Sequence, residues 1–234
     1  MHIDLSKYDF FSQESEIEVM LLPKQGYSNK NYVFTYQSSK YLLRQFILQD
    51  RDRKLEFQVQ FMAYEKRLAA KPIVLDLDEG LMICEFLAGE HKTALSKKEL
   101  TLLVQELKIL HTMKLDKNPL NITALFESPS VEVRQNLKRI EAFPKELVLC
   151  HNDLNPKNLL FSIQSLKFID WEFADMNDLY FDLAAVSVEF SLELLDEAYM
   201  LTLYFGKSGW NKKKLDAYKI IYKALCKQWF KENT

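Results

Sequence analysis

The chain has 234 residues, of which 48% are hydrophobic and 27% charged, enough for one large domain or two small lobes with their own cores. Its net charge of −2 gives no electrostatic reason for binding nucleic acid or a membrane surface, so neither is expected as a partner. No run of about 18 apolar residues occurs that would predict a membrane-spanning helix. The three cysteines are widely spaced and form no metal-binding pattern, which indicates reduced thiols in a cytoplasmic protein.

The first third of the chain alternates strand-like and helical patterns. Runs rich in β-branched and aromatic residues predict strands at 17–22, 31–37, 40–46, 73–77 and 81–86. The first three runs follow one another through short polar turns, which predicts consecutive antiparallel strands. Apolar residues at helical spacing predict one helix over 51–69, and Pro72 is expected to end it.

The rest of the chain is mainly helical in pattern. Ser96 and Glu99 have the spacing of a capping box at the start of a helix. Short apolar runs at 158–162 and 166–169 predict two strands. Helical patterns occupy most of the remaining sequence, with a break near Gly206.

This order of elements predicts an α+β fold with two lobes, like that of the protein kinases. The N-terminal lobe, 1–87, would hold an antiparallel sheet and one helix and would bind ATP. The C-terminal lobe, 88–234, would be mostly helical and would carry the catalytic and substrate-binding residues. The boundary is expected at 86–90, before the first long helix.

A cluster of polar residues with fixed spacing carries the chemistry. His151, Asp153 and Asn158 are spaced as His-x-Asp-x-x-x-x-Asn, and Ile-Asp-Trp-Glu follows at 169–172. Asp153 is the candidate catalytic base for an attacking hydroxyl, and His151 is expected to brace the same loop. Asn158 and Asp170 offer the oxygen ligands that Mg²⁺ prefers. Together they can move the γ-phosphoryl group of ATP to a hydroxyl, unless two unrelated turns share this spacing by chance.

A cation that binds the phosphates of ATP is expected from the N-terminal lobe. Arg44 occupies the centre of the predicted strand 40–46 and can bind two phosphate oxygens at once. Its expected partner is Glu56 rather than Glu65, because Glu56 lies nearer the start of the helix at 51–69. The alternative is a surface arginine and an ordinary solvated glutamate.

The turn before the second predicted strand is the candidate phosphate-covering loop. Gly26, Ser28 and Asn29 can offer hydrogen bonds to phosphate oxygens, although such turns are common without that role. No G-x-x-x-x-G-K-[ST] sequence occurs, which excludes a Walker-type NTPase. Adenine is expected at backbone groups near Glu85 and Leu87, beside the lobe boundary.

Several motifs resemble those of the choline/ethanolamine kinases, within the wider aminoglycoside-phosphotransferase-like group of small-molecule kinases. They are Gly26-Tyr-Ser-Asn-Lys-Asn-Tyr32, Leu43-Arg44, His151-Asn-Asp-Leu-Asn-Pro-Lys-Asn158, Ile169-Asp-Trp-Glu172 and Phe181-Asp-Leu-Ala184. The residues that follow Asp170 are similar to those of bacterial choline kinases, and Phe86-Leu-Ala-Gly-Glu-His-Lys-Thr93 is similar to thiamine kinases. The resemblance implies ATP and Mg²⁺ as cofactors and a small alcohol as acceptor.

The resemblance also implies individual roles. It makes Asp153 the base, Asn158 and Asp170 the metal ligands, and Asp182 a brace for the catalytic loop. From its position alone, near the start of a helical pattern, Asp182 is instead expected to cap a helix.

The resemblance further implies a cage of aromatic and acidic residues for the acceptor. The candidates are Glu172, Glu189, Phe190, Tyr222 and Trp229, with Trp210 as a further one. Carboxylates and aromatic faces are the groups that bind a quaternary ammonium. The alternative is that Tyr222 and Trp229, at helical spacing, belong to the core, and a lysine-rich final helix would normally present a solvated face.

The leading expectation is an ATP-dependent kinase that phosphorylates choline, or a similar amino alcohol, in the cytoplasm. A thiamine kinase and an aminoglycoside-type phosphotransferase remain alternatives because they would use the same catalytic residues. Thiamine is also a cation with a primary alcohol, whereas aminoglycosides would require a broad acidic groove. An inactive nucleotide-binding protein is the alternative of another class, although it would have no use for the base Asp153.

Overall fold

The computed structural model describes residues 2–12, 17–23, 25–48, 50–163 and 165–233. The chain divides into two compact units, Met1–Ala88 and Gly89–Thr234, one residue after the boundary expected from the sequence. The first unit is built on an antiparallel sheet, and the second is mainly helical with two small strand pairs. Both kinds of element are present, as the predicted α+β class requires.

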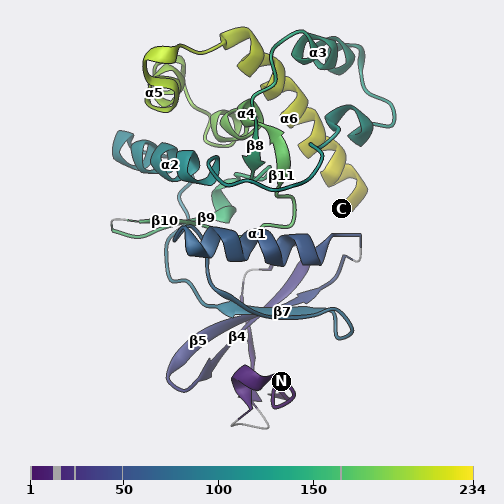
Figure 1. The fold of residues 1–234 in the computed structure, drawn as a ribbon, viewed down its shortest axis with the longest axis vertical. Helices are drawn as coiled ribbons and strands as arrows, with labels where there is room; N and C mark the ends of the chain where they lie inside the picture. Colours follow the sequence, from purple (N-terminus) through teal and green to yellow (C-terminus); the bar gives the residue numbers. More distant parts are fainter. Residues whose placement is uncertain (1, 13–16, 24, 49, 164, 234) are drawn as a thin grey trace. The chain divides into compact units, whose positions relative to one another are not determined.

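The first unit is organised by a five-stranded sheet in the order β3-β4-β5-β7-β6, in which every neighbouring pair is antiparallel. Its strands are β3 (Met20–Leu21), β4 (Asn29–Tyr36), β5 (Ser39–Phe46), β6 (Pro72–Asp76) and β7 (Leu81–Glu85). Helix α1 (Arg53–Glu65) connects β5 to β6 and lies along one side of the sheet (Figure 1). This arrangement confirms the predicted order of three strands, a helix and two strands.

The strand predicted at 17–22 is two short strands instead. Ile17–Glu18 (β2) pairs with His2–Ile3 (β1), whereas β3 pairs with β4. Val19, between them, is buried in the core of the unit together with Ile17. The apolar run at 17–22 is therefore divided between two strands that pair with different partners.

Helix α1 is shorter than predicted because local signals define both of its ends. The side chain of Asp52 accepts a hydrogen bond from the backbone N–H of Leu55 and caps the first turn. At the other end Arg67 has a φ of 62°, which a helix does not allow. Pro72 does not end this helix, as the sequence suggested, but begins β6.

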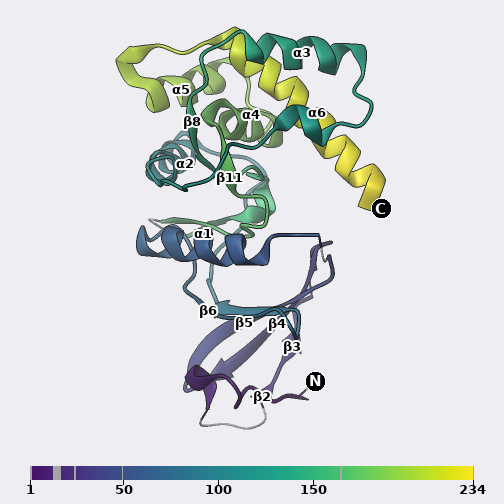
Figure 2. The ribbon, with the colours of Figure 1, turned by 45° about the vertical axis from the view of Figure 1, so that its right-hand side comes forward.

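The second unit contains five α-helices among the residues described. They are α2 (Lys97–Leu110), α3 (Val131–Glu141), α4 (Leu179–Glu189), α5 (Leu194–Phe205) and α6 (Lys212–Asn233). Helix α6 packs against α4 and α3, and α2 packs against α5 (Figure 2). Ser96 and Glu99 form the predicted capping box at the start of α2. In the part of the chain described, no helix combines the length and apolar character needed to span a bilayer.

Two strand pairs of the second unit carry the candidate site. Leu159–Phe161 (β9) pairs with Leu166–Phe168 (β10), as predicted. Leu147–Cys150 (β8) pairs with Asp175–Asp178 (β11), a strand that the sequence did not predict because Asp and Asn are disfavoured in strands. Lys214 of α6, expected on a solvated face, is buried and forms an ion pair with Asp178 over 2.6 Å.

Candidate active site

The loop between β8 and β9, residues 151–158, holds the predicted base and is named the catalytic loop for that predicted role. Leu154 is fully buried and anchors this loop, and a short 3-10 turn at Pro156–Asn158 leads it into β9. The half-buried carboxylate of Asp153 accepts hydrogen bonds from the side-chain amides of Asn155, at 3.0 Å, and Asn158, at 2.6 Å. The carboxylate is therefore held in one orientation by two neighbours from its own loop.

Burial raises the pKa of Asp153 to about 7, and the negative charges of Asp170 and Glu172 act in the same direction. The hydrogen bonds from Asn155 and Asn158 lower it, but burial outweighs them. A carboxylate with a pKa near neutrality is well matched to accepting a proton from an alcohol.

Asn158 and Asp170 meet at the start of the β9–β10 pair, because the backbone N–H of Ile169 donates to the carbonyl of Asn158 over 3.0 Å. The Asn158 amide nitrogen donates to both the carbonyl and the carboxylate of Asp153, which turns the amide oxygen to the opposite side. Asp170 follows β10 with a φ of 63°, unusual for a residue other than glycine and frequent at functional sites. The amide oxygen of Asn158 and the carboxylate of Asp170 are the kind of oxygen ligands that Mg²⁺ prefers.

His151 lies behind the loop, away from the reacting position. Its ring is fully buried, and Nε2 donates to the carbonyl oxygen of Ile169 over 3.1 Å. Burial lowers the pKa of His151, which favours the neutral ring, and the ring packs against Trp171 with centroids 4.8 Å apart. His151 therefore connects the catalytic loop to the segment that carries Asp170.

Asp182 does not cap a helix, and that prediction from its position is wrong. The N-cap of α4 is Asp178, whose side chain accepts the backbone N–H of Tyr180, and Asp182 lies one turn further along. The fully buried Asp182 carboxylate accepts the backbone N–H groups of His151, at 2.8 Å, and Asn152, at 2.9 Å. These two bonds hold the catalytic loop where Asn152 adopts a φ of 65°.

In the first unit, Arg44 of β5 and Glu56 of α1 form a buried ion pair. The second oxygen of Glu56 binds Arg53 over 2.7 Å, so one carboxylate serves two guanidinium groups. Sequence reasoning missed Arg53, although its i,i+3 spacing to Glu56 was a signal available for it.

The candidate phosphate loop is shorter than predicted, because β4 already begins at Asn29. Gly26 is exposed, and no atom lies within 4 Å of the position that a Cβ would take there. Ser28 is buried, and its carbonyl accepts the backbone N–H of Ile47 over 2.9 Å. In the amide orientation that satisfies its neighbours, Asn29 accepts from Nη2 of Arg44 over 2.8 Å.

The backbone groups expected to meet adenine lie at the end of β7. The N–H of Glu85 donates to the carbonyl of Lys71 over 3.0 Å, and the N–H of Phe86 donates to the carbonyl of Lys40 over 3.0 Å. Leu87 follows the strand and is half-buried. The sheet thus already uses the N–H of Glu85.

Two of the acceptor candidates are joined by a hydrogen bond. The hydroxyl of Tyr222, a buried residue of α6, donates to the carboxylate of Glu189 on α4 over 2.9 Å. Burial raises the pKa of Tyr222, and the neighbouring Cys226, Asp153 and Glu189 add to this effect. The negative charges of Glu189 and Asp153 also help to raise the pKa of Cys226. Sequence reasoning did not connect Cys226 with this site.

The other candidates are more dispersed. Phe190 ends α4 and is buried in the core, and Trp210 is exposed in the segment before α6. Trp229 is half-buried near the end of α6 and packs edge-on against Phe230, with ring centroids 5.2 Å apart. Glu172 is half-buried, and its negative charge helps to raise the pKa of Asp153.

Both the sequence and the fold of this chain are similar to those of known proteins. The phosphotransferase enzyme family (APH) matches residues 20–213. Protein LicA of Haemophilus influenzae is 26% identical over 236 aligned positions, which cover 89% of this chain and 68% of that protein. A thiamine kinase of Escherichia coli O17:K52:H18 (strain UMN026 / ExPEC) is 30% identical over 178 positions, covering 70% of this chain and 64% of that protein.

The fold has a similar counterpart among solved structures. The crystal structure of choline kinase LicA from Streptococcus pneumoniae superimposes with a TM-score of 0.75 at 22% identity, covering 91% of this chain and 84% of that chain. This likeness confirms the predicted α+β, protein-kinase-like fold. The family match spans the strands around Arg44, the catalytic loop and the Asp182 brace. The chain belongs to the phosphotransferase enzyme family, and it is a small-molecule kinase.

Proposed function

We propose that this kinase transfers the γ-phosphoryl group of ATP to the hydroxyl of a small cationic amino alcohol, with choline as the preferred acceptor. The observation that carries the proposal is the hydrogen bond from the buried Tyr222 hydroxyl to the carboxylate of Glu189. A carboxylate fixed by a buried phenol, with a second carboxylate near enough to influence the same phenol, favours a positively charged ligand. The S. pneumoniae structure, described as a choline kinase LicA, supports the choice of choline, and the H. influenzae relative carries the same name LicA.

In the proposed reaction, Asp153 accepts the proton of the acceptor hydroxyl. The hydroxyl oxygen forms a bond to the γ-phosphorus, while the bond from that phosphorus to the β,γ-bridging oxygen breaks. ADP leaves with the electron pair of the broken bond, and Asp153 later releases its proton to solvent. A pKa of about 7 allows both proton steps near neutral pH.

Residues of the first unit are proposed to bind the nucleotide, and residues of the second unit to bind the metal. Asn158 and Asp170 would bind Mg²⁺ through oxygen atoms, and the ion when bound neutralises negative charge on the phosphates. Arg44, positioned by its ion pair with Glu56, would supply a fixed positive charge for phosphate oxygens. The backbone at Ser28 and Leu87 would complete the nucleotide contacts.

The test is an ADP-release assay with choline, ethanolamine, thiamine and an aminoglycoside as acceptors, followed by identification of the product by phosphorus NMR. The proposal expects the highest kcat/KM for choline and phosphocholine as the product. Equal turnover of all four acceptors would contradict the proposed cation site. ADP release that no acceptor raises above background would favour an inactive nucleotide-binding protein instead.

Thiamine is the second candidate acceptor, because the E. coli thiamine kinase is 30% identical over 70% of this chain. It is a larger cation with a primary alcohol, so the same carboxylates could bind it. A higher kcat/KM for thiamine than for choline in the same assay would replace the proposed acceptor and leave the phosphoryl-transfer chemistry unchanged.

A further inference from the structure

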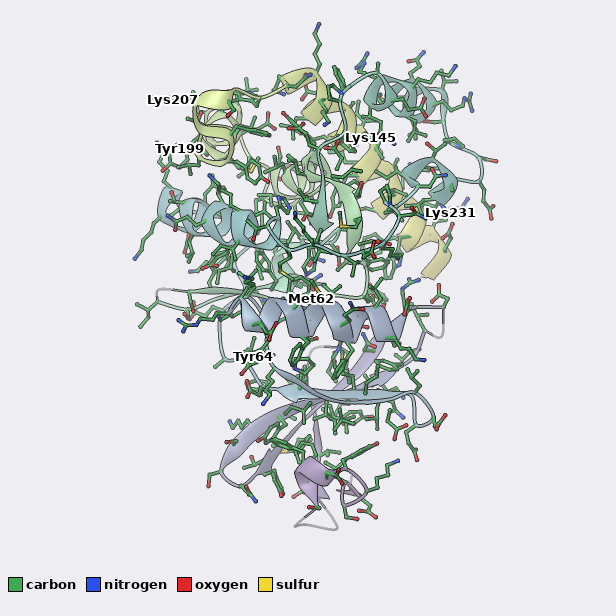
Figure 3. All side chains as sticks on the ribbon, in the orientation of Figure 1. Met62, Tyr64, Lys145, Tyr199, Lys207 and Lys231 are labelled. Atoms are coloured by element: carbon green, nitrogen blue, oxygen red, sulfur yellow. The ribbon has the colours of Figure 1, made fainter. Side chains whose placement is uncertain are left out.

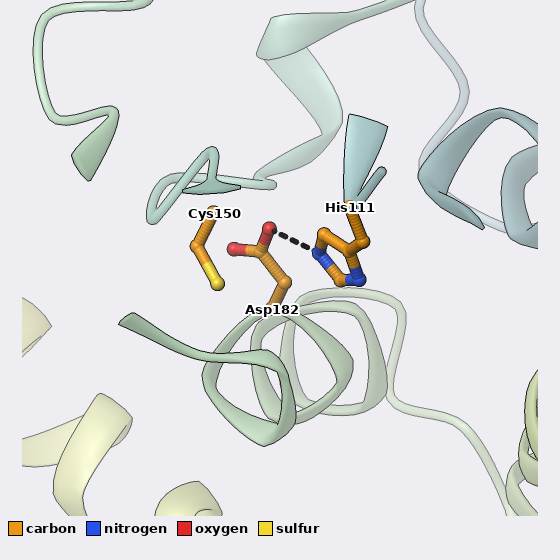
Figure 4. A group of neighbouring side chains, drawn as sticks. All are labelled: His111, Cys150 and Asp182. Carbon is orange, nitrogen blue, oxygen red and sulfur yellow. Dashed lines mark hydrogen bonds and ion pairs between the residues drawn. The ribbon is translucent and has the colours of Figure 1, made fainter. Parts of the chain in front are cut away.

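A buried polar group surrounds Asp182, whose Oδ2 is shared by the backbone N–H of His151 and by Nε2 of His111. It contains His111 at the end of α2, Asp182 on α4, and Cys150 at the end of β8 (Figure 4). Nε2 of His111 lies 3.2 Å from Oδ2 of Asp182, and Nδ1 lies 2.6 Å from the hydroxyl of Tyr204 on α5. His111 thus links Tyr204 of α5 to the carboxylate on α4 that binds the loop.

The hydrogen bonds define a direction through this group. A carboxylate oxygen can only accept, so the hydrogen of His111 lies on Nε2 and points to Asp182. Burial raises the pKa of Tyr204, which keeps its hydroxyl protonated and able to donate to Nδ1. A donor at Nδ1 selects the Nε2–H tautomer, the only neutral form that can bind Asp182.

The same three side chains have the composition of a metal site, but their ligand atoms are already engaged. Both oxygens of Asp182 accept backbone N–H groups, and both nitrogens of His111 have partners. The thiol of Cys150 lies 3.6 Å from the carbonyl of Asp178, and burial raises its pKa well above the usual value, which opposes the thiolate that zinc requires. The geometry is that of a hydrogen-bond network.

We propose that His111 and Tyr204 are positioning residues for phosphoryl transfer, acting through Asp182 on the backbone of the catalytic loop. Tyr204 fixes the tautomer of His111, and His111 fixes the orientation of the Asp182 carboxylate. Asp182 then holds the N–H groups of His151 and Asn152 in the conformation that presents the next residue, Asp153. This inference rests on the proposed role of Asp153 as the base.

The conformation of Asn152 shows what this support stabilises. Its φ of 65° is uncommon, although asparagine tolerates it better than most residues. The two hydrogen bonds of the backbone to Asp182 help to hold it, together with the bonds of the Asn152 side chain to Phe173 and Asn177. A carboxylate free to rotate would release one of its two backbone hydrogen bonds. The resulting displacement of Asp153 would slow the chemical step more than it would weaken ligand binding, because a shift of about 1 Å can cost about 100-fold in rate.

The chain offers a matched control for Tyr204. The hydroxyl of Tyr199, also on α5, is 3.0 Å from the hydroxyl of Thr101 on α2, so it joins the same two helices without touching Asp182 (Figure 3). Tyr199→Phe and Tyr204→Phe each remove one hydroxyl from one helix contact. They differ in whether that hydroxyl leads to the catalytic loop.

The experiment compares Tyr204→Phe, His111→Leu and His111→Gln with Tyr199→Phe, measuring kcat, both KM values and the melting temperature of the intact protein. We expect kcat to fall about 10- to 100-fold in His111→Leu and less in Tyr204→Phe, with both KM values within about twofold of wild type. His111→Gln should recover part of the loss, because its amide can donate to Asp182. Tyr199→Phe should keep the wild-type kcat.

Two further measurements keep a folding defect apart from a positioning role. Backbone hydrogen exchange at His151 and Asn152 should accelerate in His111→Leu but not in Tyr199→Phe. Nitrogen NMR of labelled histidine should report the Nε2–H tautomer for His111 in the wild type and a mixture in Tyr204→Phe. Equal kcat in Tyr204→Phe and Tyr199→Phe, unchanged loop exchange, or stoichiometric zinc in the purified protein would each overturn the inference.

Failure of the proposed acceptor would look different. It would appear in the wild-type acceptor assay, while the comparison of variants holds for whichever alcohol the wild type phosphorylates. Failure of Asp153 as the base would appear as near-normal turnover in an Asp153 variant.

Discussion

The side-chain amide of Asn158 donates to the carboxylate of Asp153 over 2.6 Å, so one hydrogen bond joins a proposed metal ligand to the proposed base. This bond orients both groups: it points a carboxylate oxygen of Asp153 at the amide nitrogen and leaves the amide oxygen on the other side. A metal bound at Asn158 would therefore sense the protonation of Asp153, because a charge on either group acts on the other at short range.

Replacing the base tests this arrangement directly. Asp153→Asn should lower kcat by about 10²- to 10⁴-fold, because the amide cannot accept the proton of the acceptor hydroxyl. ATP binding, measured by calorimetry, should stay close to wild type. Asp175→Asn is the control, since it removes a half-buried carboxylate from β11 that pairs with Lys117. A kcat in Asp153→Asn equal to that of the control would exclude the proposed base.

The rate should depend on pH with a defined sign. Asp153 must be deprotonated to accept a proton, and burial raises its pKa to about 7 in the protein without metal. The value of kcat/KM should therefore rise with pH and level off, with its midpoint at or below about 7 because bound Mg²⁺ favours the charged form. A pH series on wild type and Asp153→Asn measures this limb. A wild-type rate that falls over this range would contradict the assignment.

Removing the carboxylate shared by two arginines should affect stability first. Glu56→Gln removes the buried carboxylate that pairs with both Arg44 and Arg53 and should lower the free energy of unfolding by about 3–5 kcal/mol. The KM for ATP should rise as well, because Arg44 loses its orientation. Urea unfolding and ATP titration measure the two effects. Glu65→Gln, an exposed residue of the same helix, should change neither, and similar stability losses in both variants would refute the role of Glu56.

The acceptor site should respond to charge more than to shape. Glu189→Gln removes one negative charge and should raise the KM for choline about tenfold, equivalent to about 1.4 kcal/mol, with the KM for ATP unchanged. Tyr222→Phe removes only the hydroxyl that orients Glu189 and should have a smaller effect on the same constant. Glu193→Gln, at an exposed position after α4, is the control. An unchanged KM for choline in Glu189→Gln would place the cation elsewhere.

Features defined by neighbouring residues were predictable from the sequence. The capping box of Ser96 and Glu99 depends on a spacing of three residues, and the structure reproduces it. The β4–β5 hairpin and the β9–β10 pair follow from short apolar runs separated by a turn. Local chemistry was sufficient for these elements, since a strand or a helix start is specified within a few residues.

Features defined by long-range pairing were not predictable. Asp182 has the sequence context of a helix cap, and its bonds to His151 depend on a residue 31 positions earlier. Likewise β11 is a strand only because β8 lies beside it, since its own acidic residues disfavour that conformation. The Tyr222–Glu189 hydrogen bond spans 33 positions and two helices, and helical spacing alone could equally have meant core.

The brace at Asp182 also has a consequence for the order in which the protein becomes active during synthesis. A nascent chain that has emerged as far as Asp178 already contains Asp153, Asn158 and Asp170, but it lacks the carboxylate that holds the backbone between β8 and Asp153. The loop can adopt its working shape only after α4 has folded against it. A chain that ends before Asp182 would therefore lack the two hydrogen bonds that hold this loop.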